Sequence, residues 1–123
     1  MTPERLCAHL EALAGAPSDQ PFGPSVHVFR IAGRMFAILG RRNEHLALSL
    51  KCDPFLGEIL RAEHACIKPG YHLNKRHWIT IELDGSLGDD DILGLIEHSY
   101  ERVRAKLTRA ERAFLDEDAG TTA

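Results

Sequence analysis

The spacing of apolar side chains divides the first part of the chain into one helix and one loop. Apolar residues recur at helical intervals between Thr2-Pro3-Glu4, a capping sequence, and Gly15, which predicts a helix between them. Residues 15–24 then hold three prolines and two glycines. This composition is typical of a loop.

From residue 26 onward the spacing of apolar residues is typical of strands, in three consecutive segments: residues 26–31, 34–39 and 46–51. Residues 46–51 alternate cleanly, with three leucines on one face. Ala32-Gly33 is a two-residue hairpin signal between the first two segments. Residues 40–45 are expected to form a polar turn that carries Arg41 and Arg42. The sequence therefore predicts an antiparallel meander with one buried face.

The second half of the chain adds two helices and a hairpin. Asp53-Pro54 begins a helix. Its expected apolar stripe consists of Phe55, Leu56, Ile59 and Leu60. A turn that begins at Pro69-Gly70 leads into an alternating strand over residues 78–83. Ser86, three residues before Asp89, resembles a capping box at the start of the longest helix.

The charges of this last helix match its dipole. Asp89, Asp90 and Asp91 lie in the first turn, and Arg102, Arg104 and Lys106 lie near the end. Residues 116–123 are polar and are expected to form a disordered tail. These elements predict a single α+β domain over residues 1–115. We expect an antiparallel sheet of about five strands with about three helices on one side.

The composition fits one compact domain: 123 residues, 44% hydrophobic and 27% charged. No apolar run approaches the roughly 18 residues of a membrane span, and the N-terminus lacks the apolar core of a signal peptide. We therefore expect a soluble, cytoplasmic protein. Cys7, Cys52 and Cys66 are widely spaced, so free thiols are expected rather than disulfides.

The distribution of charge says more than the net charge of -3. Residues 20–81 hold nine basic and four acidic side chains, a net +5, whereas the flanks hold six basic and fourteen acidic ones, a net -8. This asymmetry predicts a basic face and an acidic face. The alternative is that the flanking helices simply carry ordinary solvated negative surfaces.

Residues 67–78 form the most distinctive block, because no acidic residue lies between Glu63 and Glu82. Its basic side chains could contact phosphates, and its aromatic rings could stack on unpaired bases. The candidate nucleic-acid-binding residues are Arg41, Arg42, Lys68, Tyr71, His72, Asn74, Lys75, Arg76 and Trp78. The alternative is a solvated turn whose aromatic rings, that of Trp78 in particular, belong to the core.

Catalysis and metal binding have weaker support. His72 or His77 could act as acid or base, Cys52 or Cys66 as nucleophile and Asp84 as orienting group, but only if folding brings them together. The chain has no glycine-rich phosphate loop, no HExxH and no GxSxG. We therefore predict no catalytic residue, no metal site and no cofactor.

Several short blocks resemble the MmcQ/YjbR family, in the same order and over nearly the whole chain. The block at residues 72–78 is the most specific of them. The blocks are Phe22-Gly23, Gly33-Arg34-Met35-Phe36-Ala37, Lys51-Cys52-Asp53-Pro54, Pro69-Gly70-Tyr71-His72-Leu73-Asn74-Lys75-Arg76-His77-Trp78, Leu83-Asp84-Gly85, and His98-Ser99-Tyr100 with Lys106-Leu107.

The resemblance implies an antiparallel sheet with helices on one side, similar to secretion chaperones, and a likeness to a double-wing DNA-binding motif. It therefore implies a non-catalytic DNA-binding protein whose basic face combines residues 68–78 with the Arg41-Arg42 turn. The alternative is an interaction or dimerisation module, with a homodimer or another protein as partner and no nucleic acid.

Overall fold

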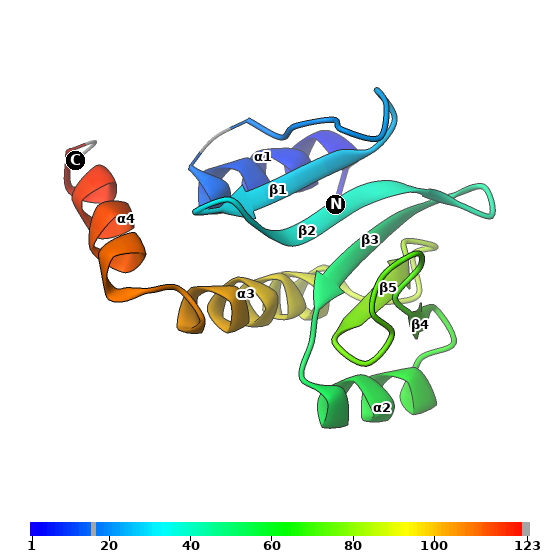
Figure 1. The fold of residues 1–123 in the computed structure, drawn as a ribbon. Helices are drawn as coiled ribbons and strands as arrows, with labels where there is room; N and C mark the ends of the chain where they lie inside the picture. Colours follow the sequence, from blue (N-terminus) through cyan, green and yellow to red (C-terminus); the bar gives the residue numbers. More distant parts are fainter. Residues whose placement is uncertain (16, 122–123) are drawn as a thin grey trace.

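The computed structural model describes residues 1–15 and 17–121, and of residues 116–121 only the helical backbone. The elements in chain order are α1 (Pro3–Ala14), β1 (His27–Ile31), β2 (Arg34–Arg42), β3 (His45–Lys51), α2 (Pro54–Glu63), β4 (Ile67–Pro69), β5 (Trp78–Glu82), α3 (Asp89–Ala105) and α4 (Arg109–Thr121). The strands form one antiparallel sheet in the order β1-β2-β3-β5-β4 (Figure 1). The predicted α+β domain with a five-stranded sheet is confirmed.

The two faces of the sheet differ in what covers them. Leu39, Leu48 and Ile81 are register partners across β2, β3 and β5, and all three are buried in the main core. On this face α1 packs on β1 and α3 crosses β2 and β3, while α2 lies at β4 (Figure 1). The adjacent row of partners, Ser49 and Thr80 among them, points to the opposite face, hereafter the open face.

Both hairpins of the meander close with two residues in the left-handed conformation, as such short loops require. The φ angles are 48° and 79° at Ala32 and Gly33, which confirms the first hairpin. They are 53° and 71° at Asn43 and Glu44. The predicted turn over residues 40–45 was therefore too long. Asn tolerates this conformation, so Arg41 and Arg42 remain in β2 rather than in the turn.

Two helices begin or pack differently from the prediction. The Ser86 hydroxyl donates to Asp84 Oδ1 at 2.6 Å, and Gly88 is the N-cap of α3 without a side-chain cap, so the predicted capping box is wrong. In α2, Leu56 and Leu60 pack against the core. Phe55 and Ile59 remain 78% and 53% exposed, because the helix turns only one side toward the sheet.

A fourth helix follows α3. Thr108 and Glu111 form a reciprocal capping box: the Glu111 N–H donates to Thr108 Oγ1, and the Thr108 N–H donates to Glu111 Oε1. This cap starts α4, whose backbone continues through residues 116–121, where the sequence predicted a disordered tail. Residues 122 and 123 lie outside the described chain. None of the helices within it is long and apolar enough to cross a bilayer.

The β4–β5 connection, residues 70–77, depends on a close backbone approach at its base. The Gly70 N–H donates to the Trp78 carbonyl at 3.0 Å. A Cβ atom added to Gly70 would lie 2.6 Å from Cβ of Trp78 and 3.1 Å from its carbonyl oxygen. Glycine is therefore required here by space rather than by its φ angle.

Gly70→Ala is expected to lower the free energy of unfolding by about 1–3 kcal/mol, because the added methyl group overpacks this contact. Urea denaturation measures the change. The matched control is Gly94→Ala in α3, where a Cβ atom meets nothing within 4 Å. It should raise stability by roughly 0.5–1 kcal/mol. Equal effects of the two substitutions would contradict the steric argument.

Candidate nucleic-acid interface

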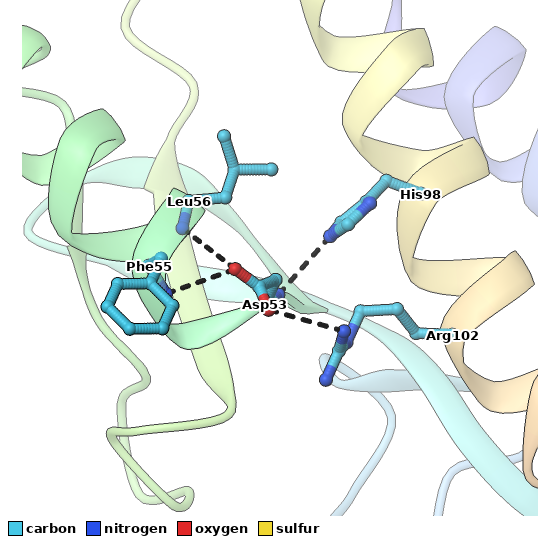
Figure 2. Close-up of polar contacts among 5 residues, drawn as sticks. All are labelled: Asp53, Phe55, Leu56, His98 and Arg102. Carbon is cyan, nitrogen blue, oxygen red and sulfur yellow. Dashed lines mark hydrogen bonds and ion pairs between the residues drawn. The ribbon is translucent and has the colours of Figure 1, made fainter.

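Three hydrogen bonds fix α3 against β2 and the end of β3. Ser99, which is fully buried, accepts the Lys51 N–H at 2.9 Å and donates its hydroxyl hydrogen to the Phe36 carbonyl at 2.6 Å. His98 Nε2 accepts the Asp53 N–H at 3.2 Å (Figure 2). Because Nε2 accepts, the proton of the neutral ring is on Nδ1. The segment from Lys51 to Asp53 is thus bound to α3 over one helical turn.

The carboxylate of Asp53 joins α2 to α3. Its Oδ2 accepts the N–H groups of Phe55 and Leu56, each at 3.1 Å, and so caps α2. Its Oδ1 lies 3.7 Å from Arg102 Nη1 on α3 (Figure 2). The arginine side chain is thereby held beside the end of β3, where Lys51 lies.

A cavity of about 160 Å³, hereafter the cationic cleft, opens at this point. Its lining residues come from β3, the β4–β5 connection and α3: Lys51, Asn74, His77, Trp78, Arg102 and Lys106. Arg102 and Lys106 are four residues apart and so share one face of the helix end. Among the described residues, only Arg102 of these cations has a carboxylate partner.

The cations that line the cationic cleft repel one another. The pKa of Lys51 is lowered, first by burial of its ammonium group and then by repulsion from Lys106, Arg102 and Arg34. The ammonium also lies 5.8 Å from the ring centroid of Trp78. Cations that repel one another favour an anion between them. The arrangement suits a phosphate or a carboxylate.

The β4–β5 connection is held by its own side chains. Lys75 Nζ donates to the Gly70 carbonyl at 3.0 Å, and the Asn74 side-chain oxygen accepts the Arg76 N–H at 2.9 Å. Lys75 and Asn74 therefore shape the loop. The side chain of Arg76 is exposed beside the cationic cleft residues of the same loop, and it makes no hydrogen bond or ion pair with the residues that the structure describes.

The remaining predicted residues lie elsewhere. The Arg42 guanidinium lies 4.4 Å from the ring centroid of Tyr71, and the Tyr71 and His72 rings are 4.0 Å apart. Arg42 pairs with His45 at the start of β3, whereas Lys51 ends that strand. Six residues of strand separate them by about 20 Å. Arg42 thus contacts the predicted segment at Tyr71, and the cationic cleft is a second group of cations at the other end of β3.

Three further predicted residues contact the fold itself or are wholly or partly buried in it. Arg41 Nη1 donates to the Glu44 carbonyl at 3.3 Å. Lys68 is half-buried in the edge strand β4. Trp78 is only 6% exposed, because Gly70 packs against it, so its position does not support base stacking.

The sequence prediction missed four of the residues that line the cationic cleft: Lys51, His77, Arg102 and Lys106. Arg102 and Lys106 were explained by the helix dipole alone. Their spacing of four residues was the available signal that they share a direction. Nothing local in the sequence shows that this direction is toward β3. Arg34 of β2 pairs with Glu111 of α4 at 3.7 Å.

Two of the residues considered for catalysis are backbone neighbours, because the Cys52 N–H donates to the His77 carbonyl at 2.9 Å. Cys52 and Cys66 are buried in the core. Burial, then the nearby Asp53 carboxylate, raises the pKa of the Cys52 thiol, which disfavours the nucleophilic thiolate. Asp84 binds Ser86 instead of a histidine. In the part of the chain that the structure describes, no three His, Cys, Asp or Glu side chains converge as metal ligands.

Fold and site together define a small α+β domain with an open sheet face and a cationic cleft at one end of the sheet. The sequence model of the YjbR family matches residues 11–102. The chain therefore belongs to the YjbR family.

Relatives and solved structures agree with this assignment. The chain is 34% identical over 115 residues to the uncharacterised protein YjbR of Escherichia coli K12, covering 94% of this chain and 98% of that one. The crystal structure of Deinococcus radiodurans DR2400 superposes with a TM-score of 0.76 at 37% identity, over 89% of this chain and 86% of that one. The crystal structure of a Pseudomonas syringae protein superposes with a TM-score of 0.71 at 30% identity, over 82% of this chain and 97% of that one.

The contact between His98 and Asp53 predicts how stability depends on pH. Burial, then the positive charge of Arg102, lowers the pKa of His98 below its ordinary value of about 6.5, although Asp53 opposes this. The folded protein thus favours the neutral ring, so the contribution of His98 is fully present above about pH 6.5 and is lost as the pH falls further.

We expect His98→Gln to weaken this pH dependence, because the glutamine side-chain oxygen can accept the Asp53 N–H without binding a proton. Urea denaturation between about pH 7.5 and 5 measures the free energy of unfolding. His9→Gln, at an exposed position of α1, controls for the loss of one histidine. If the free energy of unfolding of His98→Gln depends on pH as steeply as that of the wild type, His98 does not cause this pH dependence.

Proposed function

We propose that this protein binds DNA, non-catalytically and with weak sequence preference, through the phosphate backbone at the cationic cleft. The observation that carries the proposal is the convergence of Lys51, Arg102 and Lys106 beside the β4–β5 connection, with a single carboxylate among their partners. Ammonium and guanidinium groups on a surface are the usual partners of phosphate oxygens. A protein with this function would work where DNA is found, which favours the cytoplasm.

The shape of the surface supports contacts with phosphates rather than with bases. The cationic cleft holds about 160 Å³, which is small for a base but suits an anionic group of the size of a phosphate. Its one aromatic ring is buried. Phosphate contacts position a protein on DNA and carry no sequence information. The proposal therefore includes weak discrimination between sequences.

About three phosphate contacts would make binding modest and dependent on salt. The affinity should fall about 40-fold between roughly 50 and 200 mM salt, since each neutralised phosphate releases counterions. Lys106→Gln should weaken binding about equally for unrelated duplexes and reduce the slope of log K against log salt by about 1. Fluorescence anisotropy with a labelled duplex measures both quantities.

The matched control is Arg5→Gln, which removes one positive charge from an exposed position of α1. It should leave the salt slope unchanged. Arg76→Gln tests whether the exposed side chain of the loop adds a contact, and it spares Lys75, which holds the loop. No binding at low salt, or equal effects of Lys106→Gln and Arg5→Gln, would refute the proposal.

A second candidate function, a protein-interaction module, is favoured by one observation. Phe55 and Ile59 are 78% and 53% exposed and lie four residues apart on α2, so they form one apolar patch. Exposed apolar patches commonly mark protein interfaces. The patch lies on α2, whereas the cationic cleft is formed by β3, α3 and the loop, so substitutions can separate the two functions.

If the α2 patch makes a homodimer, Phe55→Ser with Ile59→Ser should convert a dimer to a monomer in size-exclusion chromatography with light scattering. Phe114→Ser, at another exposed apolar side chain, should leave the dimer intact. A wild-type chain that is monomeric at all concentrations tested would argue against self-association. That result would leave the DNA-binding proposal unaffected.

A further inference from the structure

The open face of the sheet contains a cavity of about 410 Å³. Its floor is formed by β2, β3 and β5. Phe22 and Val26 form one wall, and the residues from Tyr71 to Leu73 form the other. A cavity of about 150 Å³ holds benzene, and drug-sized ligands occupy about 300–1,000 Å³. This cavity, hereafter the open-face cavity, therefore has room for a bicyclic molecule.

The lining of the open-face cavity is chiefly apolar. Met35, Ile38, Ala47 and Leu73 contribute apolar surface, and Gly40 leaves the floor without a side chain. At the mouth, Phe22 and Tyr71 are 68% and 44% exposed. Large aromatic side chains that remain exposed on both sides of a hollow indicate a binding surface rather than a packing position.

The floor also carries a hydrogen-bond donor that the fold does not use. Ser49 Oγ and Thr80 Oγ1 lie 2.8 Å apart, and Thr80 Oγ1 also accepts the Tyr71 N–H at 2.9 Å. Two hydroxyl groups bring two hydrogens, and the bond between them uses one. The other hydrogen has no protein acceptor, because neither side chain makes a further bond within the described chain.

The charges at the mouth favour an anionic ligand. Arg41 and His72 line the open-face cavity, and the Arg42 guanidinium lies 4.4 Å from the Tyr71 ring centroid. No carboxylate is among the described lining residues. Neither Arg41 nor Arg42 has an ion-pair partner in the described chain. Because Arg42 and not Arg41 points to the open face, a carboxylate held at the mouth would find the Arg42 guanidinium nearby.

From these four features we infer that the open-face cavity binds a small aromatic carboxylate. Its apolar ring system would lie on Ile38 and Ala47 between Phe22 and Leu73. Its carboxylate would face the Arg42 guanidinium, and a Ser49 or Thr80 hydroxyl would donate to an acceptor on the ring. The site is separate from the cationic cleft and does not depend on the proposed DNA binding.

The test is a titration of the full chain with 2-naphthoate, followed by amide chemical shifts in two-dimensional NMR. We expect saturable shifts at Ser49, Tyr71, Leu73 and Thr80, with a dissociation constant below about 1 mM. The neutral analogue 2-naphthamide should bind about tenfold more weakly, because it lacks the charge that Arg42 recognises.

Two variants fill the open-face cavity from different strands: Ala47→Leu from β3 and Gly40→Val from β2. A Cβ atom at Gly40 meets only Val26, at an ordinary 3.7 Å, so this substitution should preserve the fold. A folded filled variant, verified by its thermal unfolding, should lose binding at least tenfold. Lys106→Gln should bind 2-naphthoate like the wild type.

Several results would overturn the inference: no saturable shift, shifts confined to residues outside the open-face cavity, or unchanged binding in a folded filled variant. Equal affinity for 2-naphthoate and 2-naphthamide would exclude recognition of the carboxylate. A dimer in which a second copy of the chain covers the open face would show that the cavity is an interface between proteins.

Discussion

The buried hydroxyl of Ser99 is the contact on which the cationic cleft depends. It accepts the Lys51 N–H and donates to the Phe36 carbonyl, so one side chain of α3 satisfies backbone groups of both β3 and β2. Without it, the Phe36 carbonyl would be left buried without this partner, at a cost of about 1–3 kcal/mol, and the part-buried Lys51 N–H would lose its acceptor. These bonds fix the rotation of α3 about its axis. Arg102 and Lys106 follow Ser99 at the C-terminal end of the helix, and this end lies beside Lys51 of β3.

The β4–β5 connection gives the domain two distinct surfaces. The contact between Gly70 and Trp78 closes its base, and Lys75 spans it. One part of the loop, with Tyr71 and His72, forms a wall of the open-face cavity. The other part, with Asn74 and His77, lines the cationic cleft. The segment that is most distinctive in the sequence therefore contributes to both sites, and neither site is complete without strands and helices from elsewhere in the chain.

Local signals in the sequence predicted most of the fold. The hairpin at Ala32-Gly33, the helix capped by Asp53 and the antiparallel meander each depend on neighbouring residues, and the structure confirms them. The site was harder to predict. Which cations meet is decided by the docking of α3 on the sheet, which joins residues about 50 positions apart. The same docking makes Ser99 a polar contact between the helix and two strands.

The most direct measurement of the central claim is the map of amide chemical shifts when a short DNA duplex is added at low salt. If the cationic cleft binds phosphates, the amides of Lys51, Asn74, His77 and Lys106 will shift, and two duplexes of unrelated sequence will give the same map. Shifts confined to α1 or to the α2 patch, or no shifts at all, would contradict the account.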